Sequence, residues 1–346
     1  MNSSSGKCIN KSNGHNRAVS LFLRCIGGVY FFSFLSFYIQ WPGLYGTNGL
    51  LPVADYIKML HSHFKVTGFG DLFMKLPSLL LAYDELGVSL TALCDAILIL
   101  GLVSSVATAA SATPAYIKPF LLFINWLCYL SIINIGQTFA SFQWDSLLLE
   151  IGFFSILLSV NYVINSQSVV TLYGARFLAW KLMFSAGVVK LQSNCQTWNL
   201  LTALEYHFAT QPLPNSISWF VHQLPPSLLR LGVGLTLVIE IPLSFLLIMP
   251  NYHWRRVGAL FQIFLQVIIL LTGNYNFFNV LTIILMIPCW SVDMTDLSTI
   301  YAKGFSIESR SDFDSRHEMA TPMPDREELS EEMPEEVSPY NKHDID

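Results

Sequence analysis

Charged side chains interrupt several long apolar runs of this sequence. A charge at the centre of a bilayer costs at least about 2.5–3.5 kcal/mol, so apolar runs rarely carry one without a partner. Such groups must pair, reach the membrane surface with their charged ends, or line a wet cavity, and the equal number of positive and negative groups favours ion pairs between helices. The acids are Asp95, Asp145, Glu150 and Glu240, and the bases are Arg24, Arg176, Lys181 and Lys190.

Two stretches, 143–150 and 176–190, concentrate these charges. Asp145 lies near the start of its expected helix, where a carboxylate suits the positive end of the helix dipole. Glu150 is five residues further on, about 140° around the helix, so it faces a different neighbour. Either the charges only fix helix pairing and register, or they build a polar intramembrane site from Asp145, Glu150, Arg176, Lys181 and Lys190. Within the second stretch, Ala186 and Gly187 would let a neighbouring helix approach closely.

A third polar stretch breaks an apolar run near the end of the hydrophobic part of the chain. Its residues are Gly273, Asn274, Tyr275, Asn276 and Asn279. Backbone groups freed by a break at membrane depth must face protein or water. Such breaks mark binding sites in some transporters, whereas the simpler interpretation is a tight turn between two short spans.

The usual sequence motifs of hydrolases, ATPases and dehydrogenases have no support in the sequence, and the histidines of the loop 192–227 lack the spacing of a metal site. Tyr206 and His207 share an aromatic loop with His222, but these histidines lack HExxH or HxH spacing. No cysteine pair has CxxC spacing, and GxSxG, Walker and dinucleotide-binding motifs are absent from the sequence. Lys and Arg are scattered, which argues against a nucleic-acid-binding face. We therefore expect no catalytic residue, metal, cofactor or nucleic-acid partner.

The elements that position these groups are apolar helices. The 346 residues are 53% hydrophobic and only 12% charged, about half the charge of an average soluble domain. A helix needs about 20 mostly apolar residues to span a bilayer. We predict an all-α polytopic transmembrane bundle of about seven or eight spans, because the last two candidates could form one broken element. The candidates are 19–40, 88–109, 117–140, 143–165, 169–191, 228–250, 256–273 and 276–290.

Charge outside the spans predicts the topology. Lys7, Lys11 and Arg17 precede the first span, so the positive-inside rule places residues 1–18 in the cytosol, where we expect them to be disordered. Alternation across the transmembrane domain, 19–290, then makes the loops 41–87 and 192–227 lumenal. Residues 291–346 are predicted to form a disordered acidic tail, since they offer too little apolar surface to bury.

Five blocks in chain order together resemble the lipase maturation factor family, its second member more than its first. The blocks are 42–46 with 49–52; 142–150; 176–190; 201–204 with Tyr206, His207 and Gln211; and 271–279. They cover nearly the whole membrane portion. In the family a C-terminal domain associated with client contact follows this membrane half, whereas here the acidic tail follows it, so the resemblance covers the membrane half only.

The resemblance implies a multi-pass endoplasmic-reticulum membrane protein without enzyme activity. It would assist the folding, maturation and secretion of other proteins in a chaperone-like way. The clients of the family's founding member are dimeric lipases such as lipoprotein lipase, so the expected partners are secreted proteins, lipases among them, and the lipid bilayer.

Two other functions remain open from the residues alone. One is a multi-span membrane enzyme, similar to a carboxylase acting on lumenal substrates, with Lys181 or Lys190 as a base and His207 as a proton carrier. The other is a small-solute transporter that uses the polar break at 273–279 together with the intramembrane charges.

Overall fold

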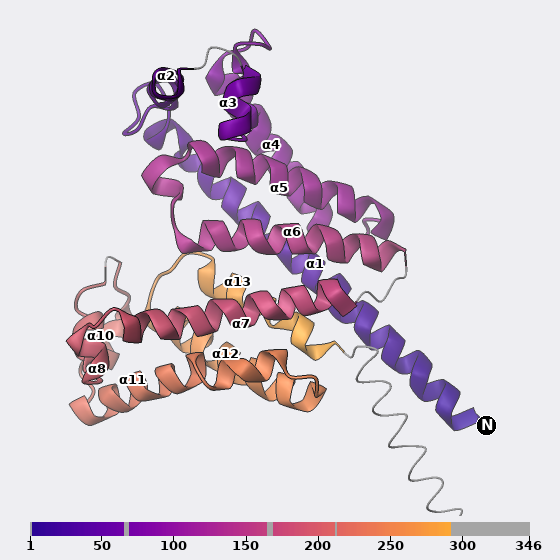
Figure 1. Ribbon diagram of the computed structural model, residues 1–346, viewed down its shortest axis with the longest axis vertical. Coiled ribbons are helices and arrows are strands. Elements are labelled where there is room, and N and C mark those ends of the chain that lie inside the picture. The colour runs from indigo at the N-terminus through magenta and orange to yellow at the C-terminus, as the bar shows by residue number, and fades with distance from the viewer. Residues whose placement is uncertain (1, 66–68, 165–168, 212, 292–346) are drawn as a thin grey trace, which may run out of the picture. The chain divides into compact units, whose positions relative to one another are not determined.

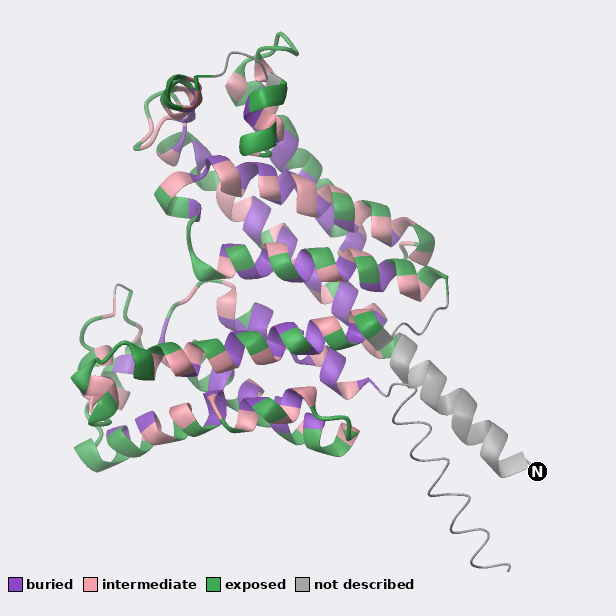
Figure 2. Cartoon of the chain, viewed as in Figure 1, coloured by how far each residue is buried: buried purple, intermediate pink, exposed green. Residues whose placement is uncertain are grey.

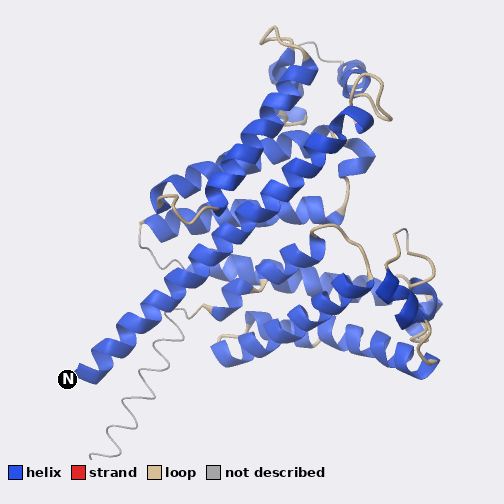
Figure 3. Ribbon diagram, turned by 180° about the vertical axis from the view of Figure 1, so that it is seen from behind, coloured by secondary structure: helices blue, strands red, loops and turns tan. Residues whose placement is uncertain are grey.

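The structure is a computed structural model that describes residues 2–65, 69–164, 169–211 and 213–291. This part of the chain consists of helices and loops and contains no strand (Figure 3), so the all-α prediction is confirmed. The α-helices are α1 (Asn2–Leu44), α2 (Val53–Phe64), α3 (Phe69–Lys75), α4 (Leu90–Ala109), α5 (Lys118–Ile135), α6 (Gln143–Val163), α7 (Val169–Gln192), α8 (Gln196–Asn199), α9 (Ala203–His207), α10 (Ser216–His222), α11 (Pro226–Glu240), α12 (Tyr252–Thr272) and α13 (Phe278–Leu285). Short 3₁₀ helices are η1 (Leu79–Tyr83), η2 (Ala115–Ile117), η3 (Gln137–Ala140), η4 (Leu243–Ile248) and η5 (Ile287–Trp290).

Six helical segments in the described residues are long and apolar enough to cross a membrane. They are Arg17–Leu44, Leu90–Ala109, Ala115–Ile135, Gln143–Val163, Pro226–Ile248 and Tyr252–Thr272, with Phe278–Trp290 as a shorter apolar helix. Helix α7 has 24 residues and matches them in length, but it carries three bases. Since α7 packs against α6 and α11, it belongs to the same bundle, and the chain is a polytopic membrane protein.

Small residues allow the first helices to pack closely. Helix α1 lies along α4, and α5 lies between α4 and α6 (Figure 1). A Cβ added to Gly27 of α1 would come within 2.7 Å of the Ala109 backbone nitrogen in α4. A Cβ added to Gly101 of α4 would come within 2.7 Å of the Phe34 ring in α1. The α1–α4 contact therefore depends on glycine at both positions.

Buried polar side chains in this part of the bundle bond to one another. Asn125 of α5 is fully buried, accepts a hydrogen bond from the Ser104 hydroxyl and donates to Thr108 Oγ1 at 3.1 Å. Both partners lie on α4, so the amide joins two helices. Figure 2 shows buried residues running along the inward-facing sides of these helices. In lipid, where water offers no alternative partner, such internal bonds hold helices together.

One end of the bundle carries most of the described loops; we call it the loop face and define it as segments 45–65, 69–89, 136–142, 193–211, 213–225 and 273–277. Tyr45 donates to the Gly136 carbonyl at 2.6 Å, which ties the end of α1 to the end of α5. The predicted loop 41–87 contains α2, α3 and η1, and the predicted loop 192–227 contains α8, α9 and α10. Helix α2 forms because Val53, Ile57 and Leu60 recur at helical spacing and bury one side.

Several boundaries differ from the sequence predictions. Helix α1 begins at Asn2, so the N-terminal segment predicted to be disordered is helical up to the span, since the segment has no proline to stop propagation of the helix. The predicted span 228–250 is broken at Ile241–Pro242 between α11 and η4. The predicted span 276–290 is shortened to α13 and η5. The predicted acidic tail lies outside the described residues except for Ser291.

We predict opposite effects for alanine at two adjacent glycines of α1. Gly27→Ala should destabilise the protein by about 1–3 kcal/mol, because the added methyl meets α4 backbone. Gly28 has no atom within 4 Å of an added Cβ, so Gly28→Ala is the matched control and should be neutral or stabilising by up to about 1 kcal/mol. Thermal unfolding in detergent measures both, and equal midpoints for the two variants would contradict the α1–α4 contact.

Candidate functional site

A buried ion pair joins α7 to α11 near the loop face. Lys190 Nζ lies 2.8 Å from Glu240 Oε1 and 2.6 Å from Oε2, and it also donates to the Ala186 carbonyl at 3.1 Å. The Glu240 side chain is only 5% exposed and the Lys190 side chain 21%. All three ammonium protons therefore have acceptors, and the carboxylate is neutralised where it is buried.

The sequence of α11 explains why Glu240 can reach this position. Pro242 lacks an N–H and interrupts the helix, so α11 ends at Glu240 and η4 starts at Leu243. The Gln262 side chain of α12 donates to the Ile239 carbonyl at 2.7 Å, which satisfies one carbonyl beside the break. A Cβ on Gly187 would lie 2.5 Å from Ile241 Cγ1, so glycine lets α7 approach the break, as the sequence predicts.

A cavity of about 250 Å³ lies beside this pair. Apolar side chains from α7, α12 and α13 form part of its wall, among them Leu182, Met183, Ile269 and Phe278. Its polar lining includes Lys190, Trp198, His207, Glu240, Tyr275 and Asn279. We call this space the α7–α12 cavity; it combines an apolar wall with hydrogen-bonding groups, which is the usual composition of a small-molecule site.

A second polar contact crosses the cavity from the loop segments. The Tyr275 hydroxyl lies 3.0 Å from His207 Nε2, and the tautomer of the imidazole decides which of the two donates. Burial lowers the pKa of His207 and raises the pKa of Tyr275, so both groups are held in their neutral forms. Together with the neutralised Lys190–Glu240 pair, this leaves the cavity without net charge.

The predicted polar break is a turn between α12 and α13 that contributes to two pockets. Tyr275 and Asn279 line the α7–α12 cavity, and Asn276 lines a separate pocket. Asn279 is fully buried and donates to Gln266 Oε1 at 3.1 Å. Gly273 is buried next to the Tyr275 ring, and Asn274 is exposed. Of the two loop residues proposed with them, His207 joins the cavity, whereas Tyr206 is 58% exposed and is not among the residues that line it.

The five residues of the predicted intramembrane cluster do not meet at one place. Lys181 pairs with Glu150 at 2.9 Å, and Lys190 pairs with Glu240 instead. The remaining two, Arg176 and Asp145, bond elsewhere. Arg176 donates to the carbonyls of Pro288 and Ser291, and Asp145 accepts from the Tyr129 hydroxyl. The reason is geometric, since neighbouring charges on one helix point to different partners. The expectation of interhelical ion pairs holds for two of the four acids in the apolar runs.

Several cavity residues were not among the predicted site residues, and Glu240, Trp198 and Gln266 are three of them. Glu240 was recognised only as a charge in an apolar run, although its position two residues before Pro242 signals a helix break. Trp198 covers the pair from α8, with its ring 5.4 Å from Lys190 Nζ. Gln266 lies in the middle of α12, where a polar residue within an apolar run is the signal that could have identified it.

Comparison with known proteins decides the family. The family model described as "Lipase maturation factor transmembrane domain" matches residues 17–296. The chain belongs to the lipase maturation factor family. It is 41% identical over 278 residues to Lipase maturation factor 2 of Xenopus laevis, covering 78% of this chain and 38% of that relative. It is 37% identical over 279 residues to the same-named protein of Homo sapiens (77% and 38%). It is 31% identical over 290 residues to Lipase maturation factor 1 of Bos taurus (82% and 50%).

The similarity confirms the resemblance seen in the five sequence blocks, including the greater likeness to the second member of the family. The matched range contains every span and both sides of the α7–α12 cavity. The chain spans 38% of the length of the frog and human members of the family named here, so the similarity concerns their membrane part. No solved structure matches the chain.

We predict that the Lys190–Glu240 pair is needed for folding. Lys190→Met or Glu240→Gln alone should destabilise the protein by about 3–5 kcal/mol, because each leaves a buried partner without its counter-charge or its acceptor. The swapped pair, Lys190→Glu with Glu240→Lys, should recover part of the loss. Size-exclusion chromatography of a fluorescent fusion in detergent measures the folded fraction; wild-type profiles for both single variants would contradict this role.

We also predict that acid weakens the protein through His207. Its folded pKa lies below the ordinary value of about 6.5, so the unfolded chain binds more protons and stability falls as the pH drops below that value. His207→Gln should reduce the loss of melting temperature between pH 7.5 and 5.5. His63 lies on the exposed side of α2, so His63→Gln is the control and should leave the wild-type slope unchanged. An unchanged slope in both variants would exclude His207 as the cause.

Proposed function

We propose that this chain is the membrane part of an endoplasmic-reticulum protein that assists the folding, maturation and secretion of secreted proteins such as dimeric lipases. The observation that carries the proposal is the similarity over residues 17–296 to proteins named lipase maturation factors. In this proposal the partners are the client proteins and the bilayer, and the chain performs no reaction of its own.

Helix α10 supports the proposal, because it offers a fixed apolar surface on the loop face. Trp219 is 62% exposed and Phe220 is 66% exposed, and their rings stand edge to face with centroids 5.1 Å apart. Asn215 caps α10 by accepting from the Ser218 N–H at 2.8 Å, and its amide donates to the Leu271 carbonyl at 3.0 Å. Exposed aromatic residues held in place are typical of protein-binding surfaces.

The distribution of bases supports a lumenal loop face. The opposite end of the bundle carries Arg24, which donates to the Ala109 carbonyl at 3.0 Å, together with Lys118 and Arg256. Short connections rich in Lys and Arg remain on the cytosolic side. The loop face, which carries α8, α9 and α10, would then meet secreted clients in the lumen.

The bonding of the lysines gives little support to the enzyme alternative. A catalytic lysine needs a free amine at neutral pH, which usually requires burial away from a counter-charge. Lys190 donates to three oxygens, two of them on Glu240. Lys181 pairs with Glu150 through both carboxylate oxygens, at 2.9 and 3.1 Å. Each amine is thus already bonded to a carboxylate of a neighbouring helix.

The proposal predicts that aromatic residues of α10 matter for client maturation. In cells that lack the endogenous protein, a transgene that carries Trp219→Ser with Phe220→Ser should rescue secreted lipase activity several-fold less well than the wild-type transgene. The physical reason is the loss of two large apolar contacts, each worth on the order of 1–2 kcal/mol at an interface. Lipase activity in the medium and the amount of protein in the membrane fraction are the two measurements.

Trp254 supplies the matched control. It is 55% exposed at the start of α12, at the end of the bundle opposite the loop face. Trp254→Ser should rescue as well as the wild type at equal membrane abundance. Full rescue by the α10 variant would argue against client contact at α10, and no loss of lipase activity in the knockout would argue against the proposed function itself.

A further inference from the structure

A second pocket, also of about 250 Å³, lies outside the α7–α12 cavity. Three separate parts of the chain build it: α1, the segment from η3 into the first turn of α6, and the turn before α13. We call it the aromatic pocket. In the described part of the chain its lining contains five aromatic rings, one acid and no base. The rings belong to Phe37, Phe139, Phe142, Trp144 and Phe277, and the acid is Asp145.

Asp145 has an unmet hydrogen-bonding requirement. Its side chain is 3% exposed, and Oδ1 accepts from the Tyr129 hydroxyl at 2.6 Å. Oδ2 is buried and has no hydrogen-bond partner. If the carboxyl is ionised, Oδ2 lacks a donor or counter-charge; if Oδ2 carries a proton, that proton lacks an acceptor. Burial without a partner costs free energy in either state. A cation bound next to Oδ2 would supply the missing partner and remove that cost.

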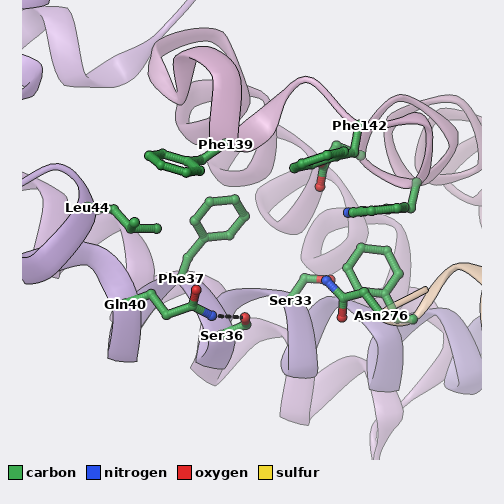
Figure 4. A pocket seen from close by; sticks show the side chains of 11 residues that line it. Ser33, Ser36, Phe37, Gln40, Leu44, Phe139, Phe142 and Asn276 are labelled. Atoms are coloured by element: carbon green, nitrogen blue, oxygen red, sulfur yellow. Dashed lines mark hydrogen bonds between the residues drawn. The ribbon is translucent and has the colours of Figure 1, made fainter. Parts of the chain in front are cut away.

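The aromatic rings of the pocket can attract an organic cation through their faces. Figure 4 shows the rings of Phe37, Phe139 and Phe142 gathered around the space. Phe142 and Trp144 stack with centroids 4.5 Å apart, on the segment that also carries Asp145. Ring faces attract cations electrostatically, and cages of several rings recognise quaternary ammonium groups, whose methyl surface cannot donate strong hydrogen bonds.

Polar side chains line the α1 wall of the same pocket. Ser36 and Gln40 lie one turn apart and bond to each other at 2.7 Å. Asn276, from the turn before α13, lies beside Ser33 (Figure 4). These groups could hydrogen-bond a phosphate attached to the cation. The pocket lies at the loop-face end of α1 and α6, at the depth where lipid headgroups meet the ends of spanning helices.

We propose that the aromatic pocket binds a quaternary ammonium group of the choline type, with Asp145 as the counter-charge and the rings as its cage. This site is independent of the proposed role in client maturation. The same chemistry is presented by a phosphatidylcholine headgroup and by free choline, so the test must separate the two sources.

The test uses the full chain purified in mild detergent and exposed to equal amounts of phosphatidylcholine and phosphatidylglycerol. Native mass spectrometry counts the lipids retained, and tetramethylammonium chloride is the competing probe, with sodium chloride at the same ionic strength as its control. The wild type should retain phosphatidylcholine preferentially and lose it to tetramethylammonium. Asp145→Asn keeps the shape but removes the charge, and it should reduce the preference by about tenfold or more.

Phe142→Leu tests the cage without touching the buried acid, so it remains informative if Asp145→Asn folds poorly. Phe142 directly precedes α6 and is 43% exposed, whereas Phe153 within α6 is 49% exposed and does not line the pocket. Phe153→Leu and Asp95→Asn are therefore the matched controls and should retain phosphatidylcholine like the wild type. The Phe142→Leu variant should retain several-fold less phosphatidylcholine than the wild type.

Three outcomes separate the sources and the failure. Retention of phosphatidylcholine that tetramethylammonium displaces identifies a lipid headgroup as the ligand. If free choline raises the melting temperature of the wild type but not of Asp145→Asn, and the wild type shows no preference between the two lipids, the ligand is a soluble cation. The proposal is overturned if Asp145→Asn and Phe142→Leu match their controls in both assays. It is also overturned if the wild type neither retains phosphatidylcholine preferentially nor is stabilised by free choline.

Discussion

The structure depends on neutralising charge inside a bundle of apolar helices. Lipid offers no hydrogen bonds, so each polar group at that depth needs a partner within the protein. The Lys190–Glu240 pair meets this requirement with a bidentate contact that links α7 to α11. Arg176 meets it with the carbonyls of Pro288 and Ser291, which joins α7 to the end of η5. Helix α7 can therefore carry three bases and still pack among spans that are far more apolar.

The same requirement shapes the cavities at the loop face. A break in a helix frees backbone groups, and both breaks in the second half of the bundle are served by side chains from a neighbouring helix or loop. Gln262 bonds to a carbonyl beside Ile241–Pro242, and Gln211 donates to the Thr272 carbonyl at 3.0 Å where α12 ends. The α7–α12 cavity takes residues from next to both breaks, since Glu240 precedes the first and Tyr275 follows the second. The residues that flank the breaks therefore also supply polar groups to the cavity.

The sequence predicted the spans better than it predicted the contacts between them. Apolar length locates α4, α5, α6 and α12 within a few residues, because hydrocarbon thickness sets the length of a span. The presence of Gly187 next to a close neighbour was also predictable from residue size. The partner of Lys190 was not, because Glu240 is 50 residues away and either of two other acids, Asp145 and Glu150, would have satisfied the same charge rule. Pairing of this kind follows from which faces of the helices meet, and one sequence carries little information about that.

In the loops, too, local helices could be predicted from the sequence, whereas contacts between distant segments could not. Helix α2 could have been found from the spacing of its buried residues, whereas the contact of His207 with Tyr275 joins segments 68 residues apart. The functional surfaces at the loop face depend on such long-range contacts. They also depend on whether α7, with its three bases, crosses the membrane: only then do the segments 193–225 and 273–277 share one side with 45–89.

The claim that α7 crosses the membrane is tested most directly by labelling single cysteines with a membrane-impermeant maleimide in sealed vesicles. Ile164→Cys and Asn199→Cys flank α7 at its two ends, both positions are exposed, and the native cysteines would be replaced. We predict that the two positions are labelled from opposite sides of the membrane, with Asn199→Cys on the same side as a cysteine placed at Ser62 in α2. Labelling of positions 164 and 199 from one side would show that α7 does not cross, and would contradict the bundle and its ion pair together.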